Sequence, residues 1–350
     1  MSGGVDSLGA AILLLEQGYD VTGITFVNWN EKTKGVIASK EKPTPEQSAV
    51  EAKKLCDTLG IPHHTVDLCE EFEIVLDYFS ESYLKGETPN PCIFCNRNFK
   101  FKHLAAFADR LGITKIATGH YAGVKSENQR YYLYRAFDDW KDQTFMLWNL
   151  PQSILSRCVF PLSGLMKEKV KEMVGERGFA TQSKNRESFN LCFVPDDDYK
   201  QFLIRRNSDK FDNLSNGDVL DEKGVSIGTH EGYPFYTIGQ SKGFQINSEK
   251  RKYIYKINSV ANTLQVADKQ KLYQTKIRVD SLNFQKQETM SGKYRLFVRI
   301  RGKDIGMFAE VTFDNLETEV VFEQPVFAPA VGQSAVFYEG NAVVCGGTIC

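Results

Sequence analysis

The stretch that decides the fold is residues 2–7, "SGGVDS", which opens an apolar segment predicted to be a helix over residues 7–17. Glycines let a backbone turn tightly and approach a ligand closely. The N-terminus of the following helix presents unpaired N–H groups and the positive end of its dipole to an anion. Ser2 and Ser7 add hydroxyl donors, and Asp6 is a candidate magnesium ligand. The string is not the G-x-x-x-x-G-K-[ST] loop, and it predicts a phosphate-binding loop of another kind.

Strands and helices alternate after this loop. The predicted strands cover residues 20–26, 64–68 and 115–119, and the predicted helices cover residues 45–60, about 70–85, and 97–112. This alternation predicts an α/β domain with a mostly parallel sheet. A phosphate loop of this kind should follow a central strand, whereas the sequence begins at the loop. We therefore expect the first strand to be missing and a central position of the sheet to be unfilled.

The sequence changes in character from about residue 215. Short alternating runs interrupted by Asn, Gly and Asp follow one another, such as "KYIYKINSVANTLQVAD" (252–268) and "KYRLFVRIRG" (293–302). Such runs are typical of small all-β units. We expect three domains: an α/β domain over residues 1–206, a small β-rich central domain over residues 207–275, and a C-terminal β-barrel over residues 276–350.

Composition excludes several classes of protein. With 42% hydrophobic and 25% charged residues, the chain has the make-up of an ordinary globular protein. No run of about 18 apolar residues predicts a membrane span, and no signal peptide is recognisable, so we expect a cytoplasmic protein. A net charge of −1 excludes a uniformly basic nucleic-acid binder, although basic residues in all three predicted domains are consistent with one basic face for RNA phosphates.

The eight cysteines are too few for a disulfide-stapled secreted domain, so we expect most to be reduced. Two of them form a C-x-x-C pair in "NPCIFCN" (90–96). This pair is compatible with half of a zinc site, with a redox pair, or with a site that handles sulfur as a substrate. A zinc ribbon is disfavoured because no second C-x-x-C exists, and Cys345 and Cys350 are too widely spaced to complete it.

Several longer strings occur in a fixed order and carry a resemblance. They are "TPNPCIFCNRNFKF" (88–101), "ATGHYA" (117–122), "KDQTFML" (141–147), "NLCFVPDDDY" (190–199), "IGTHEGYPFYTIGQSKG" (227–243) and "GQSAVFY" (332–338). The first loop resembles the PP-loop of ATP pyrophosphatases. Together the strings resemble the tRNA-specific 2-thiouridylases (MnmA/TrmU type) over nearly the whole chain. Those enzymes activate the C2 oxygen of the wobble uridine with ATP and replace it with sulfur carried as a cysteine persulfide.

The resemblance implies roles for named residues. ATP would be bound by Ser2, Gly3, Gly4, Val5, Asp6, Ser7, Phe26 and Gly119. Cys192 would carry the persulfide, and Cys95 would attack it or close a disulfide that frees the sulfur. Contacts with tRNA would come from Asn90, Pro91, Cys92, His120, Lys141, Asp142, Gln143, Arg299, Arg301 and Gln333. The resemblance further implies ATP and magnesium as cofactors and tRNA as a partner, with a sulfur donor protein, either a cysteine desulfurase or a relay carrier. We expect a monomer.

One residue departs from the family pattern. Cys92 stands where most of the family has aspartate in an "NPD" motif. One hypothesis is that Cys92, Cys95 and Cys192 ligate an iron–sulfur cluster of the [4Fe-4S] type, whose fourth iron would be free to hold a sulfide. Zinc on the same ligands is a weaker form of this hypothesis. The other hypothesis is a persulfide–disulfide relay between Cys95 and Cys192, in which Cys92 is a bystander.

Two further functions remain open from the sequence. A different PP-loop adenylating enzyme, an amidotransferase or a synthetase, would use ammonia and would need no paired cysteines. An inactive tRNA-binding relative would keep the β units while lacking adenylation. ATP-dependent release of AMP with tRNA separates these alternatives from a 2-thiouridylase.

Overall fold

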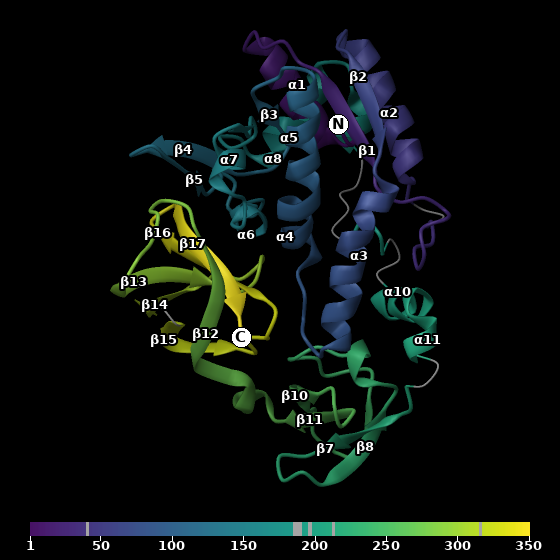
Figure 1. The fold of residues 1–350 in the computed structure, drawn as a ribbon, viewed down its shortest axis with the longest axis vertical. Coiled ribbons are helices and arrows are strands. Elements are labelled where there is room, and N and C mark those ends of the chain that lie inside the picture. Colours follow the sequence, from purple (N-terminus) through teal and green to yellow (C-terminus); the bar gives the residue numbers. More distant parts are fainter. Residues whose placement is uncertain (40–41, 185–190, 195–197, 212–213, 315–316) are drawn as a thin grey trace. The chain divides into compact units, whose positions relative to one another are not determined.

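The computed structural model describes residues 1–39, 42–184, 191–194, 198–211, 214–314 and 317–350 (Figure 1). It divides into two compact units. The first comprises residues 1–75, 92–206 and 341–343, and the second comprises residues 76–91, 207–340 and 344–350. In the part of the chain that the structure describes, no helix is long and apolar enough to cross a membrane.

The first unit is the predicted α/β domain. Its helices are α1 (Val5–Glu16), α2 (Pro45–Leu59), α5 (Phe101–Arg110), α6 (Thr144–Leu147), α7 (Gln152–Leu155), α8 (Lys167–Glu176), α9 (Ala180–Lys184) and α10 (Tyr199–Arg206). Its strands are β1 (Gly23–Val27), β2 (His63–Asp67), β3 (Ile116–Ala117), β4 (Gly123–Glu127), β5 (Arg130–Tyr134) and β6 (Cys158–Val159). Strand β1 pairs in parallel with β2, and β3 pairs in parallel with β6. The parallel α/β class is therefore confirmed, with the parallel strands in two separate pairs.

Local sequence explains where helix α2 begins and ends. Thr44 and Gln47 form a capping box, in which each side chain bonds the backbone N–H of the other residue, and Pro45 occupies the first turn. Gly60 ends the helix in the left-handed region with φ of 71°. Helices α1 and α8 share an apolar core that includes Leu8 and Val170, so the phosphate loop is attached to a packed helix.

The helix predicted over residues 97–112 is part of a longer helical segment that begins at Pro91 and contains a π-helical turn. Helix α4 (Pro91–Cys95) precedes a π-helical turn η1 (Asn96–Lys100), and α5 continues from it. A π-helical turn inside a helical segment is frequent at functional sites. Helices α3 (Cys69–Leu84) and α4 both contain residues of each unit.

The second unit contains a small mixed sheet and a barrel. The small sheet has the order β10-β11-β7-β8-β9, formed by β7 (Gly217–Leu220), β8 (Ser226–His230), β9 (Gln245–Ile246), β10 (Tyr253–Asn258) and β11 (Thr263–Ala267). Short helices α11 (Ser208–Phe211), η2 (Tyr233–Phe235) and η3 (Lys269–Leu272) accompany it. The β-rich central part is therefore confirmed as a fold class.

The barrel is formed by six antiparallel strands (Figure 1). They are β12 (Tyr273–Phe284), β13 (Gly292–Arg299), β14 (Met307–Phe313), β15 (Thr318–Phe327), β16 (Ser334–Glu339) and β17 (Ala342–Ile349). The order β12-β15-β14-β13-β16-β17 closes because β12 also pairs with β17. Alternate residues of these strands, among them Val279, Val311 and Phe337, fill its interior. The predicted C-terminal β-barrel is confirmed.

Candidate active site

The phosphate loop surrounds the N-terminus of α1. Gly3 has a φ of +76°. Gly4 is the N-cap residue of α1, and it has no side chain that could accept a hydrogen bond from the first N–H groups of the helix. The hydroxyls of Ser2 and Ser7 lie 3.1 Å apart, and the backbone N–H of Gly4 donates to Ser2 Oγ at 3.4 Å. The predicted donors are thus gathered at the positive end of a helix dipole, which suits them to an anionic ligand.

Gly119 packs directly on this loop. A Cβ at this position would lie 2.6 Å from the carbonyl carbon and oxygen of Asp6 and 2.8 Å from the nitrogen of Ser7. These are backbone atoms, which cannot move aside as a flexible side chain can. The close approach explains why glycine stands here, and it connects the "ATGHYA" segment to the phosphate loop.

The carboxylate of Asp6 is fixed by two residues that the sequence did not indicate. Lys167 Nζ lies 2.5 Å from Asp6 Oδ1 in an ion pair whose lysine side chain is only 3% exposed. The hydroxyl of Tyr121 donates to the same oxygen at 2.9 Å. Both contacts use Oδ1, so Oδ2 is the atom of Asp6 that suits a cation.

Phe26 lies on β1 and is half-buried. Its ring packs edge-to-face on Phe99, with the centroids 6.2 Å apart. An aromatic face at the end of a parallel strand suits a stacked base, although sequence alone suggested this role only through the family pattern.

The three predicted thiols lie near enough to affect one another. Cys92 and Cys95 are one turn apart on α4, and Cys192 follows the first unit's helix α9 along the chain. Asn28 Nδ2 lies 3.6 Å from Cys192 Sγ, and the indole N–H of Trp29 donates to the carbonyl of Cys192 at 3.1 Å. Burial first, and then the charge of Cys192, raises the pKa of Cys95 to about 12. The pKa of Cys192 is also raised, by desolvation and by the charge of Cys92.

All eight cysteines lie in the described residues, and all are free thiols. No three His, Cys, Asp or Glu side chains among the described residues are placed so that they could hold a metal ion, and this includes Cys92, Cys95 and Cys192. The structure therefore does not show a site for a single metal ion such as zinc on these three sulfurs, and the [4Fe-4S] cluster stays a prediction.

His120 and Lys100 lie beside each other in the first unit. Lys100 Nζ is 3.5 Å from His120 Nε2, and Thr118 Oγ1 is 2.7 Å from His120 Nδ1. The imidazole stacks on Phe101 with the ring centroids 5.8 Å apart. Burial, aided by the charge of Lys100, moves the pKa of His120 well below its usual value, so the ring is neutral. The sequence indicates Lys100 only as one of the basic residues that could face RNA phosphates, and nothing local to it predicts a contact with His120.

The "KDQ" residues serve the structure in different ways. The Asp142 side chain is buried and accepts hydrogen bonds from Thr144 Oγ1 at 2.8 Å and from the N–H of Ala136 at 3.2 Å. A direct contact between Asp142 and tRNA is therefore not supported, because the carboxylate is enclosed.

Gln143 and Tyr121 are joined by two hydrogen bonds: the backbone N–H of Tyr121 donates to Gln143 Oε1 at 2.9 Å, and the backbone N–H of Gln143 donates to the carbonyl of Tyr121 at 2.8 Å. Gln143 thus fixes the segment that carries Gly119 and His120, and Lys141, next to Asp142, is half-buried.

In the second unit, two predicted tRNA contacts also have structural partners. Arg299 is 5% exposed, and its guanidinium donates to the carbonyls of Asp304 and Gly302. The prediction that Arg299 contacts tRNA is therefore not supported. Arg301 donates to the carbonyl of Ala328 and lies 5.8 Å from the Phe327 ring centroid.

Gln333 holds the loop that precedes the thiols. Its Nε2 donates to the carbonyl of Thr88 at 2.7 Å and to that of Pro89 at 3.3 Å. Asn90 is half-buried and Pro91, the first residue of α4, is buried. The amide of Gln333 is thus bound to the backbone directly before "NPC".

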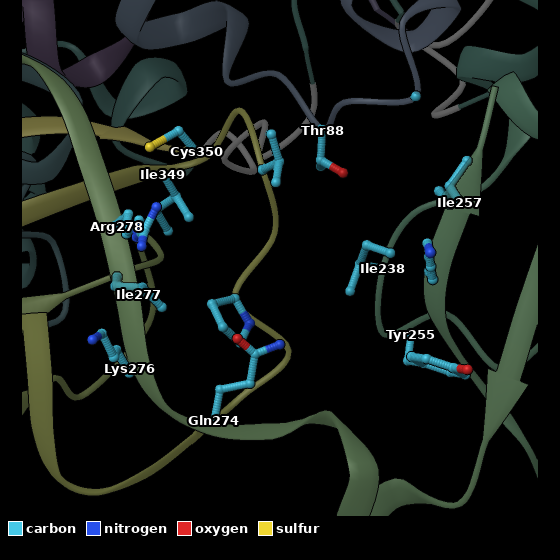
Figure 2. A pocket seen from close by; sticks show the side chains of 14 residues that line it. Thr88, Ile238, Tyr255, Ile257, Gln274, Lys276, Ile277, Arg278, Ile349 and Cys350 are labelled. Carbon is cyan, nitrogen blue, oxygen red and sulfur yellow. The ribbon is translucent and has the colours of Figure 1, made fainter. Parts of the chain in front are cut away.

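A cavity of about 490 Å³ lies in the second unit (Figure 2). Basic side chains of Lys256, Lys276 and Arg278 line it together with Tyr255 and several isoleucines. None of the predicted site residues lines this cavity, and Lys276 and Arg278 are paired with Glu319 and Glu317. We therefore place the chemistry at the phosphate loop and the thiols and not here.

Comparison with known sequence families matches most of the chain, in three parts. Residues 1–196 match "tRNA methyl transferase HUP domain", residues 208–268 match "tRNA methyl transferase PRC-barrel domain", and residues 274–349 match "Aminomethyltransferase beta-barrel domain". A solved structure from Methanocaldococcus jannaschii, titled as a predicted subunit of tRNA methyltransferase, covers 54% of this chain and 91% of its own. Its TM-score of 0.28 and identity of 18% are too low to carry an argument.

Full-length relatives are much more similar. "tRNA-specific 2-thiouridylase MnmA" of Cytophaga hutchinsonii is 40% identical, over 100% of this chain and 95% of the relative. The proteins of the same name from Amoebophilus asiaticus and Salinibacter ruber are 38% and 39% identical, over 100% of this chain and 93% and 92% of the relatives. This chain belongs to the tRNA-specific 2-thiouridylase (MnmA) family.

Proposed function

We propose that this protein is a tRNA 2-thiouridine synthase, which adenylates the C2 oxygen of a wobble uridine with ATP and replaces it with persulfide sulfur. The observation that carries the proposal is the uncapped N-terminus of α1, against which Gly119 packs, in the same unit as the mutually interacting thiols. An adenylating loop and a set of thiols are the two components that this reaction needs. We further propose a cytoplasmic monomer that receives sulfur from a cysteine desulfurase or a relay carrier.

The phosphate loop supplies the anion site. Ser2, Ser7 and the first N–H groups of α1 would hold the ATP phosphates, and Phe26 and Gly119 would line the adenine side. Asp6 would offer Oδ2 to magnesium, which screens phosphate charge when it is bound. Lys167 and Tyr121 keep this carboxylate oriented. A carbonyl oxygen is a poor leaving group, whereas an adenylated oxygen leaves as AMP.

The thiols supply the sulfur. The terminal sulfur of a Cys192 persulfide forms a bond to C2, and the C2–O bond breaks with its electron pair leaving on AMP. The thiolate of Cys95 then attacks Cys192 Sγ, which forms a Cys95–Cys192 disulfide and leaves the terminal sulfur on the uridine. The two cysteines are oxidised in this step, so a dithiol reductant must restore them before the next turnover. Our candidates for the tRNA side remain His120, Lys141 and Gln143 of the first unit and Asn90, Pro91, Arg301 and Gln333 of the second unit.

We propose that Cys92 is a bystander that replaces the aspartate of the family's "NPD" motif. The relay requires Cys95 and Cys192 and uses no atom of Cys92, whose charge acts to raise the pKa of each. The proposed relay routes no step through an iron–sulfur cluster.

A methyl transfer is the rival that the family descriptions suggest by name. The purified chain would be incubated with unmodified tRNA, magnesium–ATP and a persulfide donor, and the nucleosides would be analysed by mass. We expect AMP release that depends on tRNA, and a uridine heavier by an oxygen-to-sulfur exchange. In a parallel incubation with S-adenosylmethionine in place of ATP and the persulfide donor, a methylated uridine would overturn the proposal. ATP-dependent amidation of the substrate, or no AMP release at all, would favour the other PP-loop enzymes or an inactive relative.

A further inference from the structure

Two large aromatic side chains lie exposed on the loop between β5 and α6. Trp140 is 95% exposed and Phe137 is 70% exposed, whereas the other two tryptophans of the chain, Trp29 and Trp148, are buried. Single exposed apolar residues are ordinary on a protein surface, but two large rings within four residues form a local feature that contributes little to the core. We call residues 137–140 the aromatic loop.

Buried hydrogen bonds fix the backbone of the aromatic loop. The backbone N–H of Trp140 donates to Oδ1 of Asp138, a residue that is only 3% exposed, at 3.2 Å. The backbone N–H of Lys167 donates to Oδ2 of the same carboxylate at 2.9 Å, and the N–H of Phe137 donates to the carbonyl of Ser163 at 2.8 Å. The two rings therefore extend from an ordered loop, and order before binding lowers the entropic cost of a contact.

The aromatic loop is connected to the phosphate loop through Lys167. The backbone of this residue is bonded by Asp138, and its ammonium group pairs with Asp6 of the phosphate loop at 2.5 Å. Both loops are thus attached to one lysine, so a partner bound to the aromatic loop lies in the neighbourhood of the proposed adenylation site. In the proposed reaction, the large partner that must reach this neighbourhood is tRNA.

The chemistry of the aromatic loop favours a nucleic-acid base over a protein. Asp139 and Lys141 flank Trp140 in the sequence, and Asp139 pairs with Arg135 at 3.1 Å. The core of a protein interface is depleted of charged residues, whereas base stacking needs only the face of one ring. With two aspartates against one lysine, residues 137–141 carry no surplus of positive charge. The contact that these residues suit is therefore to a base and not to a phosphate.

We propose that the aromatic loop is an RNA-contact surface, on which Trp140 stacks on an unpaired base of the tRNA and Phe137 offers a second ring. This inference rests on the proposed use of tRNA as the substrate. A uridine inside a base stack must leave the stack before its C2 oxygen can be adenylated. The bases that it leaves exposed gain from new stacking partners, and aromatic side chains are the usual ones in RNA recognition.

Fluorescence quenching tests the proposal with a probe that the chain already carries. Because Trp29 and Trp148 are buried, acrylamide should quench mainly the emission of Trp140. Unmodified tRNA would be added without ATP, and Trp140→Phe would be measured in parallel to give the signal of the two buried tryptophans. We expect tRNA to remove most of the acrylamide-accessible emission, and to change little in Trp140→Phe. Full accessibility of Trp140 in the tRNA complex would overturn the proposal.

The affinity for the same tRNA gives a second measurement. Trp140→Ala should raise the tRNA Kd about tenfold, which lies within the range for loss of one stacked aromatic residue. The slope of log Kd against log salt concentration should stay the same, because no phosphate contact is lost. Tyr19→Ala is the matched control, since Tyr19 is a 48% exposed aromatic residue of the same unit, and it should bind tRNA like the unmodified chain. Both variants replace exposed rings and keep the bonds of Asp138, so we expect them to fold.

An unchanged Kd in Trp140→Ala would overturn the proposal, and a smaller salt slope would assign Trp140 to a phosphate contact instead. Protection of Trp140 by a cysteine desulfurase but not by tRNA would assign the aromatic loop to a protein interface. These binding measurements need no chemistry, so the two proposals fail separately. Normal thiolation with no role for Trp140 in binding contradicts only this inference, whereas tRNA binding through Trp140 without thiolation contradicts only the proposed reaction.

Discussion

Substitution of Gly119 by alanine tests the junction between the phosphate loop and the "ATGHYA" segment. The new Cβ would lie 2.6 Å from backbone atoms of Asp6, where ordinary contact begins near 3.4 Å. The loop must therefore recede by about 0.8 Å, and overpacking of this kind costs about 1–3 kcal/mol of unfolding free energy. A displacement near 1 Å at a reacting group can slow a reaction by about a hundredfold. We expect tRNA-dependent AMP formation to fall by about tenfold to a hundredfold.

The assay has two readouts and one control. Urea unfolding measures the loss of stability, and AMP formation at saturating ATP measures the loss of alignment. Gly164→Ala is the matched control, because a Cβ there meets nothing within 4 Å, and its effect should stay within about 0.5 kcal/mol. If Gly119→Ala is as stable and as active as Gly164→Ala, the reasoning about this close approach is wrong.

Three other predictions concern the remaining site residues. Asp142→Ala should cost about 1–3 kcal/mol in urea unfolding because the N–H and hydroxyl of Thr144 lose their acceptor, while the tRNA Kd stays the same; a weaker tRNA Kd with full stability would restore a contact role. Because burial raises the pKa of Cys95 to about 12, its alkylation rate should rise about tenfold for each pH unit through neutral pH, and a plateau below about pH 9 would contradict this. Cys92→Asp should preserve or raise thiolation, and loss of activity would show that Cys92 is no bystander.

The fold class could be read from the sequence because periodicity reports which face of an element is buried. The strand–helix alternation and the short β runs both gave the correct class. The β4–β5 hairpin was missed because its turn, Asn128-Gln129, lacks the glycine that usually marks one. Both residues have positive φ, 49° and 62°, as a two-residue type I′ turn requires. The π-helical turn at residues 96–100 could not be predicted, because the spacing of apolar residues does not show where backbone hydrogen bonds change from i→i+4 to i→i+5.

The site was only partly readable from the sequence. Motif order identified the phosphate loop and the thiols, but Lys167 reaches Asp6 across 161 residues and leaves no local signal. Arg299 was assigned to tRNA through the family resemblance, and the structure satisfies its guanidinium with backbone carbonyls. Such roles depend on tertiary contacts, which composition and spacing do not encode.

The most direct test of the central claim is mass analysis of tRNA nucleosides from a bacterial strain that lacks its own 2-thiouridylase. The strain would carry this chain, its Cys192→Ser variant, or its Cys158→Ser variant as a buried-cysteine control. We predict 2-thiouridine derivatives with the unmodified chain and with Cys158→Ser, and none with Cys192→Ser, although that variant should still bind tRNA. Full thiolation by Cys192→Ser, or a stable chain that restores no 2-thiouridine, would contradict the account.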